Sequence, residues 1–578
     1  MADPERRLAG VAGADGIVVG PVYRLADVEM PAEGAGGPEE QARALTALQA
    51  VAARLGEASA RMRTAGRTEE AEILEAGQLM AEDPSLLAEV EALADGQSAA
   101  AALLEATERQ AALLAAIPDP YLAARAADVR RLGRQAARLA SGPPTSQPLP
   151  PQAGEGEQVV LVARDLGPTD LAELELEGVT IGGIALAEGS VTSHAAIVAR
   201  SLGVPLVVGL GEQVLTVGGG LTTVLDGMSG LLVISPDQKS LREAQAAVER
   251  QERRRAALAQ SREHGAVTAD GHRIRLLVNA STEREVLAAL EAVAEGVGLL
   301  RTELAFLDAT SWPDEAQHEA ALRPIFQHVA GRTVTVRTLD FGADKTPPFL
   351  HGRAERGIAL QLAAPGALEA QFRALLKVGA ETGAGAGLRI MLPLVERAEQ
   401  VEAARRLLHA AHESVGPETP LPPLGAMIET RAAVDQIDAI AAVADFLSIG
   451  TNDLVHDLLG LDRLTPAATV RSAADPRVLR AVGAVTAAAR NHDRSVEVCG
   501  EAAGDPRIAI MLIGLGVSEL SVAPSRLDEV RAAIRAVALA EAAHLAETAL
   551  TLGSADAVLA LVDSGLAERL QSARLSSE

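Results

Sequence analysis

The stretch FLSIGTNDL, residues 446–454, combines a short apolar run typical of a buried strand with a polar end at Asn452 and Asp453. Seven other stretches after residue 265 have the same strand-like character and are separated by helical patterns: RIRLLVNA (273–280), GVGLLRTE (296–303), TVTVRTLDFG (333–342), LRIMLPLV (388–395), LGAMIET (424–430), SVEVCGE (495–501) and ELSVAP (519–524). Eight strands alternating with helices are the signature of a parallel (β/α)8 barrel. We therefore predict such a barrel within residues 265–578.

The predicted strands end in polar side chains of several kinds. Active sites of (β/α)8 barrels lie at the carboxyl ends of the strands, so these side chains are expected to converge on one mouth. Arginines offer planar forks for carboxylate and phosphate oxygens, and carboxylates combined with a substrate phosphate suit Mg²⁺ better than Zn²⁺. The sequence thus predicts a site for a small phosphorylated acid held on a divalent ion, with Glu429 and Asp453 as metal ligands. The residues at the predicted mouth are Arg301, Arg337, Asp340, Glu429, Asn452, Asp453, Cys499 and Glu501, with Arg463 shortly after the sixth strand.

Cys499 is the single cysteine of the chain, so no internal disulfide is possible. At a barrel mouth, a thiol facing the substrate can donate a proton to a carbanion or enolate, or it can act as a nucleophile. The residues alone leave both roles open.

The first part of the chain predicts a different organisation. Residues 8–24 are typical of short strands around a glycine-rich turn, and residues 38–139 have an almost wholly helical pattern with breaks at AGR, EDPS and IPDP. This pattern predicts a helical bundle. The Pro/Gly-rich residues 141–158 predict a linker, and further strand-like segments predict a compact β/α domain that ends near Pro236. A charged helix over 241–264 then leads toward the barrel.

Within the β/α domain, EGSVTSHAAIVARSLGVPLVVG (188–209) places His194 at the start of a predicted helix. Unpaired backbone N–H groups in a first helical turn attract anions. A capping turn with an incidental histidine is the alternative, and this stretch by itself does not separate the two. By contrast, His409 and His412 lack a neighbouring carboxylate or cysteine cluster, and we expect them on the surface of an outer helix.

The composition excludes several classes of function. A net charge of −26 over 578 residues argues against nucleic acid as a partner. The start of the chain lacks the apolar core of a signal peptide, and no later run is long enough to span a bilayer, so we expect a cytoplasmic protein without membrane insertion.

Taken together, these stretches resemble enzyme I of the phosphoenolpyruvate-dependent sugar phosphotransferase system, over nearly the whole chain and in family order. The resemblance is carried by GSVTSHAAIVARSLGVPLVVG, GVGLLRTE, VRTLDFGADK, IMLPLV, MIET, SIGTNDL, LDR and CGEAAGD, and in the helical region by EAGQLMAEDPSL and DPYLAARAADVRRLGR. It implies four parts: residues 1–30 and 146–236 as a phosphohistidine β/α domain, 31–145 as an inserted helical domain that binds the phosphocarrier protein HPr, 237–264 as a linker helix, and 265–578 as a phosphoenolpyruvate-binding barrel that also forms a homodimer.

The resemblance also implies roles for single residues. His194 would take the phosphoryl group of phosphoenolpyruvate and pass it to a histidine of HPr, with Thr192 holding the imidazole in its reactive tautomer. Glu429 and Asp453 would hold Mg²⁺, and Cys499 would protonate the enolate of pyruvate. The residues implied to grip the substrate are Arg301, Arg337, Asn452 and Arg463, with Lys345 close by and Arg356 matching a further arginine of the family. Because His194 must meet both the donor and HPr, we expect its domain to swivel on segments near 141–158 and 236–265.

Three departures and several alternatives accompany this interpretation. Ser190 replaces a glycine of the family, GRAE precedes Arg356 in place of the usual approach, and Gln78 stands where many relatives have histidine. Pyruvate phosphate dikinase and phosphoenolpyruvate synthase are similar in the histidine and barrel domains, but residues 1–140 do not resemble their ATP-binding domain. A non-catalytic sensor of phosphoenolpyruvate and an enzyme I that serves dihydroxyacetone phosphorylation are the alternative functions.

Overall fold

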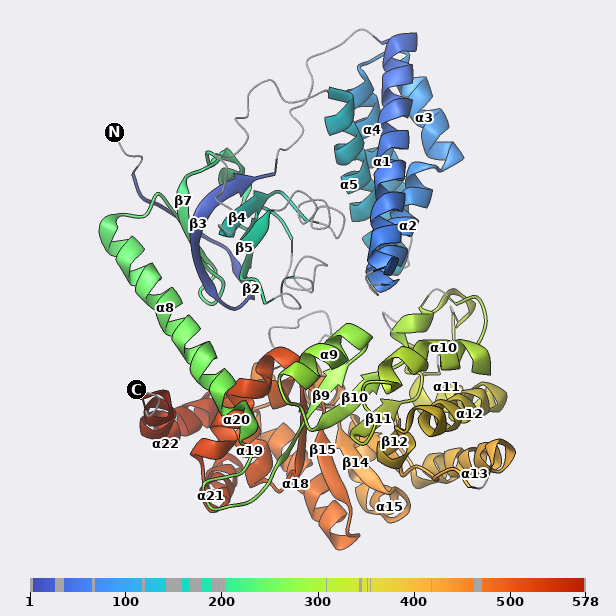
Figure 1. Cartoon of the computed structure of the whole chain (residues 1–578), viewed down its shortest axis with the longest axis vertical. Coiled ribbons are helices and arrows are strands. Elements are labelled where there is room, and N and C mark those ends of the chain that lie inside the picture. Colours follow the sequence, from blue (N-terminus) through green and yellow to red (C-terminus); the bar gives the residue numbers. More distant parts are fainter. Residues whose placement is uncertain are drawn as a thin grey trace. The chain divides into compact units, whose positions relative to one another are not determined.

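The computed structural model shows a chain of two compact units, Met1–Glu252 and Arg253–Glu578, each of which is described by itself (Figure 1). The structure describes residues 4–25, 36–64, 68–116, 120–141, 158–166, 179–189, 199, 203–307, 309–342, 346–350, 352–353, 355–416, 418–461 and 470–575.

The second unit contains a closed barrel of eight strands in which each strand pairs in parallel with the next and β16 closes onto β9. The strands are β9 (Arg275–Ala280), β10 (Gly296–Arg301), β11 (Thr333–Arg337), β12 (Leu388–Leu392), β13 (Leu424–Ile428), β14 (Phe446–Ile449), β15 (Ser495–Val498) and β16 (Glu519–Val522). All eight lie within the stretches predicted from the sequence. The predicted (β/α)8 barrel is therefore confirmed.

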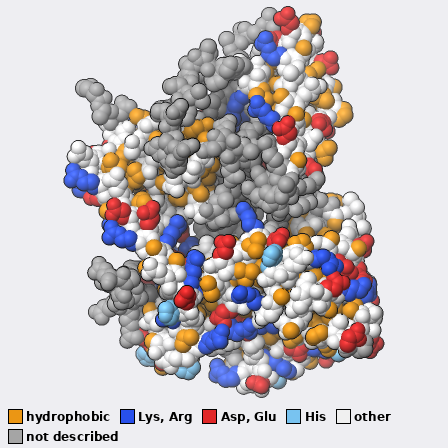
Figure 2. Space-filling view, in the orientation of Figure 1, with side chains coloured by type: hydrophobic (Ala, Val, Ile, Leu, Met, Phe, Trp, Pro, Cys, Tyr) orange, Lys and Arg blue, Asp and Glu red, His pale blue; other side chains and the backbone are white. Residues whose placement is uncertain are grey.

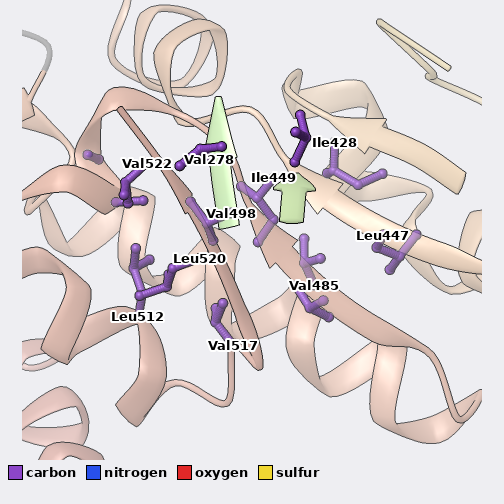
Figure 3. Close-up of a cluster of buried hydrophobic side chains, with 14 of the residues drawn as sticks. Val278, Ile428, Leu447, Ile449, Val485, Val498, Leu512, Val517, Leu520 and Val522 are labelled. Atoms are coloured by element: carbon purple, nitrogen blue, oxygen red, sulfur yellow. The ribbon is translucent and has the colours of Figure 1, made fainter. Parts of the chain in front are cut away.

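Alternate side chains of each strand serve two different cores. Figure 3 shows Leu447 and Ile449 of β14 and Val498 of β15 in the apolar layer between strands and outer helices, with Val485 on a helix opposite them. The intervening positions face the barrel interior, where a separate small cluster forms from Leu299, Met391, Met427, Phe446 and Cys499. The strand periodicity thus places Cys499 inside the barrel.

The helices that cover the barrel follow the strands in sequence order (Figure 1). They are α9 (Glu283–Glu291), α10 (Glu315–Phe326), α11 (Gly357–Leu362), α12 (Pro365–Thr382), α13 (Ala398–Val415), α14 (Arg431–Asp435), α15 (Ile437–Val443), α16 (Thr451–Leu459), α18 (Pro476–Asn491), α19 (Pro506–Gly514), α20 (Leu527–Ala536), α21 (Leu539–Ala549) and α22 (Ala555–Leu575). Short 3-10 turns are η2 (Ser261–Glu263), η3 (Leu304–Phe306), η4 (Pro348–Leu350), η5 (Gly385–Gly387), η6 (Glu501–Gly504) and η7 (Pro524–Arg526).

The first unit contains a mixed sheet of eight strands in the order β1-β8-β7-β3-β4-β5-β6-β2. Its middle, from β3 to β6, is parallel, and the remaining pairs are antiparallel. The elements are β1 (Arg6–Ala9), β2 (Val11–Ala14), β3 (Ile17–Arg24), β4 (Gln158–Ala163), β5 (Thr180–Leu186), β6 (Leu206–Val208), η1 (Glu212–Thr216), β7 (Thr222–Asp226) and β8 (Leu231–Ile234). The strand-like segments at both ends of this region are therefore confirmed as one sheet.

A helical part interrupts the sheet between β3 and β4, with its own core of alanine, leucine and valine side chains. Its helices are α1 (Pro38–Thr64), α2 (Thr68–Ala81), α3 (Pro84–Ala94), α4 (Ala99–Ala115) and α5 (Pro120–Ser141). The predicted breaks at AGR, EDPS and IPDP coincide with helix boundaries. A further break, at Asp95–Ser98, was not predicted; there the Ser98 side chain accepts a hydrogen bond from the backbone N–H of Ala101 and caps α4.

The charged helix α8 (Gln238–Gln260) contains the boundary between the two units. Its first half packs on the sheet unit through Ala244, beside Val224 and Val233. In its last turns, Arg254 pairs with Glu529 of the barrel unit at 3.1 Å.

On the face drawn in Figure 2, Lys and Arg side chains are interspersed with Asp and Glu. None of the described helices is both long and apolar enough to cross a membrane.

Candidate functional site

The carboxyl ends of the barrel strands bring together the described residues that the sequence predicted for the site. Arg301 and Arg337 are the last residues of β10 and β11 and are partners in the parallel register. Glu429 directly follows β13, and Cys499 directly follows β15. Asn452 and Asp453 lie in the first turn of α16, just after β14.

Arg337 is the buried cation of this mouth. Its Nη2 donates to Glu303 Oε1 at 2.5 Å, and its Nη1 lies 2.9 Å from Asp340 Oδ2. Burial alone would lower the pKa of Arg337, but Asp340, Glu303 and Glu429 together raise it above its ordinary value, so the guanidinium stays charged. Its Nε is buried and has no hydrogen-bond partner among the described residues. One donor of this buried guanidinium therefore remains for a ligand.

Glu303 was not predicted as part of the site. The sequence offers one signal for it, an acidic residue two positions after Arg301 in GVGLLRTE. The pattern cannot show that this carboxylate is fully buried and turned toward Arg337.

Glu429 is a buried carboxylate beside the same arginine. The backbone N–H of Leu394 donates to its Oε1 at 2.7 Å. Burial, Asp340 and Asp453 raise the pKa of Glu429 to about 8, against the lowering effect of Arg337. The carboxyl group thus keeps a proton near neutral pH because it is buried and because other carboxylates lie near it. Carboxylates placed so close together are the donor set of a hard divalent cation.

The chain itself does not complete a metal site here. Among the residues that the structure describes, no group of three or more His, Cys, Asp or Glu side chains is arranged to hold a metal ion. Two carboxylates leave coordination positions for substrate oxygens and water, as is usual for Mg²⁺. The neighbouring Asn452 is held by a different contact, because its Oδ1 accepts a hydrogen bond from the backbone N–H of Glu501 at 3.0 Å.

Arg356 also lies at this mouth, despite the unusual GRAE that precedes it. It is the N-cap of α11, and its side chain packs against Gly342, which follows β11. A Cβ added to Gly342 would stand 2.7 Å from Arg356 Nε, and Gly342 has a φ of +144°, so only glycine suits this close approach. The Nε of Arg356 is buried and, like that of Arg337, has no hydrogen-bond partner in the described part of the chain.

Cys499 is buried, with 2% of its surface exposed, at the inner end of β15. The hydroxyl of Ser448 donates to its Sγ at 3.3 Å, and the Asn279 side chain donates to its backbone carbonyl at 3.0 Å. Burial and the neighbouring Glu497 raise the pKa of the thiol to about 12. The sulfur is therefore a protonated thiol at neutral pH and suits proton donation better than nucleophilic attack.

Four of the predicted site residues, His194, Thr192, Lys345 and Arg463, lie outside the described residues, as does Ser190. Of the two histidines expected on the surface, His409 is exposed, while His412 is half-buried on α13, with its Nε2 2.7 Å from the carbonyl oxygen of Thr419. Gln78 of α2 donates to Glu82 at 3.2 Å.

The described mouth therefore offers guanidinium groups with unused donors, a pair of acidic side chains and a protonated thiol. Guanidinium forks bind phosphate and carboxylate, the acidic pair suits a divalent cation, and the thiol can deliver a proton.

Comparison with known proteins adds independent findings. Three family models match the chain: PEP-utilising enzyme, N-terminal, over residues 9–125; PEP-utilising enzyme, mobile domain, over residues 155–230; and PEP-utilising enzyme, PEP-binding domain, over residues 255–539. The last of these spans the barrel.

Curated relatives match over most of the chain. It is 38% identical to a phosphoenolpyruvate-protein phosphotransferase of Streptomyces coelicolor over 95% of this chain and 99% of that protein. A phosphoenolpyruvate-protein phosphotransferase of Geobacillus stearothermophilus is 32% identical over 96% of this chain and 98% of that protein. A multiphosphoryl transfer protein of Xanthomonas campestris is 36% identical over 96% of this chain, which spans 66% of that longer protein.

Proposed function

The chain belongs to the family of phosphoenolpyruvate-protein phosphotransferases, enzyme I of the phosphotransferase system, and from this premise we propose its reaction. The phosphoryl group of phosphoenolpyruvate passes to His194 and then to a histidine of the phosphocarrier protein HPr, with release of pyruvate. The observation that supports this most is the buried charge cluster at the barrel mouth, where Arg337 and Arg356 keep unused donors and Arg337 acts on a protonated thiol.

Substrate binding is the first task of this cluster. The unused Nε donors of Arg337 and Arg356 suit phosphate or carboxylate oxygens, and Arg301 extends the same cationic face. Glu303 and Asp340 form ion pairs with the two Nη atoms of Arg337, which orients the guanidinium before substrate binds. Asn452, Arg463 and Lys345 are proposed as further substrate-binding residues.

Glu429 and Asp453 are the residues proposed to hold Mg²⁺. They fit the ion because their oxygens are hard ligands, and because burial and the nearby carboxylates raise the pKa of Glu429, a cost that a bound cation would offset. When bound, Mg²⁺ neutralises charge on the phosphoryl group and orients its oxygens.

Cys499 is proposed as the acid of the reaction. Departure of the phosphoryl group from phosphoenolpyruvate leaves the enolate of pyruvate, which becomes pyruvate when its methylene carbon gains a proton. The Cys499 thiol is protonated at neutral pH, directly follows β15 and packs among the side chains of the barrel interior.

The phosphohistidine step requires two partners in succession. His194 belongs to the region matched by the mobile-domain model, so a swivel between the barrel mouth and HPr is proposed, with Thr192 holding the imidazole tautomer. The helical part α1–α5 is proposed to dock HPr. A homodimer through the barrel and a cytoplasmic location stay predictions.

The decisive experiment is intact mass spectrometry of the full chain after incubation with phosphoenolpyruvate and Mg²⁺. We expect one acid-labile phosphoryl adduct on the wild type, none on His194→Ala, and loss of the adduct when HPr is added. His409→Ala is the matched control, because it removes an exposed histidine on α13 and should leave the adduct intact.

The outcome separates the proposed reaction from its alternatives. A folded chain that binds phosphoenolpyruvate without forming an adduct would contradict the proposal and support a sensor. An adduct that persists in His194→Ala would overturn the assignment of the phosphorylated residue. An enzyme I that serves dihydroxyacetone phosphorylation would be identified only by the downstream proteins that accept phosphoryl groups from HPr.

A further inference from the structure

Ser448 is a buried polar residue of β14 that the proposed reaction does not use. Its neighbours Leu447 and Ile449 lie in the apolar layer between strands and helices (Figure 3). Strand alternation therefore turns Ser448 toward the barrel interior, where it has no exposed surface. In the parallel register it is the partner of Glu497 on β15, two residues before Cys499.

The Ser448 hydroxyl makes one directed contact with the thiol. Its Oγ donates to Cys499 Sγ at 3.3 Å, and the Sγ in turn faces the carbonyl oxygen of Ile449 at 3.8 Å. The sulfur thus accepts a hydrogen bond from one residue of β14 and directs its own proton at the next. Two neighbouring groups of one strand fix the thiol rotamer.

This contact acts against the effects of burial and of the nearby carboxyl groups on the thiol. Burial and the carboxyl group of Glu497 disfavour a thiolate, whereas the Ser448 hydrogen bond lowers the pKa of Cys499. Arg337 acts in the same direction from the barrel mouth. Among the described side chains, Ser448 alone donates a hydrogen bond to the sulfur.

We propose that Ser448 is a positioning residue for the acid of the reaction: its hydroxyl holds the Cys499 thiol in place and stabilises the thiolate left after proton donation. This inference rests on the proposed function, in which Cys499 is the acid. The S–H bond of Cys499 breaks, a C–H bond forms at the methylene carbon of the enolate, and the electron pair of the S–H bond stays on sulfur. Ser448 keeps its own proton throughout, and solvent returns a proton to the thiolate before the next turnover.

The single cysteine makes the contact directly observable, because the chain has one S–H stretching band in an infrared region free of other protein absorption. In Ser448→Ala we expect the band to move to higher frequency, since a thiol that no longer accepts a hydrogen bond donates its proton less strongly. Cys499→Ala should abolish the band and so assign it. Thr486→Val is the control: it also removes a buried hydroxyl of the barrel unit, one on α18 whose hydrogen bond goes to the carbonyl oxygen of Leu515 at 2.7 Å rather than to sulfur.

Turnover supplies the second readout. For Ser448→Ala we expect pyruvate release to slow by roughly 10- to 100-fold, the usual cost of one hydrogen bond to a charged group, with an unchanged KM for phosphoenolpyruvate. An unmoved S–H band in Ser448→Ala, or an equal shift in Thr486→Val, would overturn the proposed contact. A shifted band with normal pyruvate release would overturn the positioning role. If the wild type released no pyruvate at all, the proposed function would fail, while the infrared comparison would still report on the contact.

Discussion

Cys499 shows how burial sets the reactivity of one residue. Its thiol is buried, and its pKa is raised to about 12 by burial and Glu497. Alkylating reagents attack the thiolate, so both the scarcity of thiolate and the lack of access protect this sulfur. We expect iodoacetamide to modify the folded chain at pH 8 roughly 100-fold or more slowly than the unfolded chain, followed as a mass increase on intact protein.

Unfolding the same sample in guanidinium serves as the control, because it exposes the thiol and restores an ordinary pKa. Rapid alkylation of the folded chain would contradict both the burial of Cys499 and its protonated state.

Individual site residues were predictable from the sequence where each lies at the carboxyl end of a predicted strand. Arg301, Arg337, Glu429 and Cys499 could be assigned to one mouth because the carboxyl ends of parallel strands share one edge. Glu303 and Ser448 could not be assigned in this way. Their importance lies in which neighbour they face, Arg337 for one and Cys499 for the other, and that depends on packing across strands.

The helix α10 carries a buried histidine that governs stability in acid. His318 is buried with its ring 4.9 Å from that of Phe306, and burial lowers its pKa to about 4. Between pH 6.5 and 4 the unfolded chain binds a proton at this histidine and the folded chain does not, so the free energy of unfolding falls as the pH drops through this window. The loss from this residue is about 3 kcal/mol.

We therefore expect His318→Leu to weaken the acid dependence of the barrel unit between pH 6.5 and 4, measured by urea unfolding at several pH values. His409→Leu, at an exposed position of α13, should leave that dependence as it is in the wild type. Equal acid dependence in the wild type and His318→Leu would show that His318 is protonated in the folded state as well.

The junction of β14 and α16 requires glycine at position 450 for a steric reason. A Cβ there would stand 2.8 Å from Glu429 Oε2 and 3.1 Å from Glu429 Cβ. Gly450→Ala should therefore displace the carboxylate and lower kcat/KM for phosphoenolpyruvate by about 10- to 100-fold, measured as Mg²⁺-dependent phosphorylation of the chain.

Gly483→Ala on α18 is a suitable control, because its added Cβ would meet only Leu515 Cδ2 at 3.8 Å. It should leave phosphorylation unchanged and stabilise the helix by up to about 1 kcal/mol. Normal activity of Gly450→Ala would mean that the Glu429 carboxylate can move without loss of function.

At the scale of single elements, the sequence predicted most helix boundaries from residues that interrupt the helical pattern. The breaks at AGR, EDPS and IPDP were predicted. The break at Asp95–Ser98 contains a glycine too, but it was missed, because the alanine-rich helical pattern continues on both sides of it. All eight barrel strands were predictable because short strand-like stretches alternate regularly with helical patterns after residue 265.

For the whole molecule, the structure separates two units that do not share a hydrophobic core. The large core of the barrel unit consists of residues from Ala266 to Val562, whereas the helical and sheet parts of the first unit form clusters of their own. The predicted hinge near 236–265 corresponds in the structure to a continuous helix, α8, over Gln238–Gln260. The swivel itself stays a prediction. Separate hydrophobic cores allow the two units to move independently, but they do not define the extent of that movement.

Separate cores predict separate unfolding. We expect scanning calorimetry of the full chain to resolve more than one transition, and Gly483→Ala to identify the barrel unit by raising the Tm of one of them. Phosphoenolpyruvate with Mg²⁺ should raise that same Tm, because a ligand at 100 times its Kd stabilises the unit that binds it by about 2.7 kcal/mol. Removal of the metal with EDTA, or the substitution Glu429→Gln, should abolish the shift while leaving the transition of the first unit in place. A single transition that moves as a whole with the ligand would contradict this expectation, since it would mean that the two units unfold as one and that binding at the barrel mouth stabilises the entire chain.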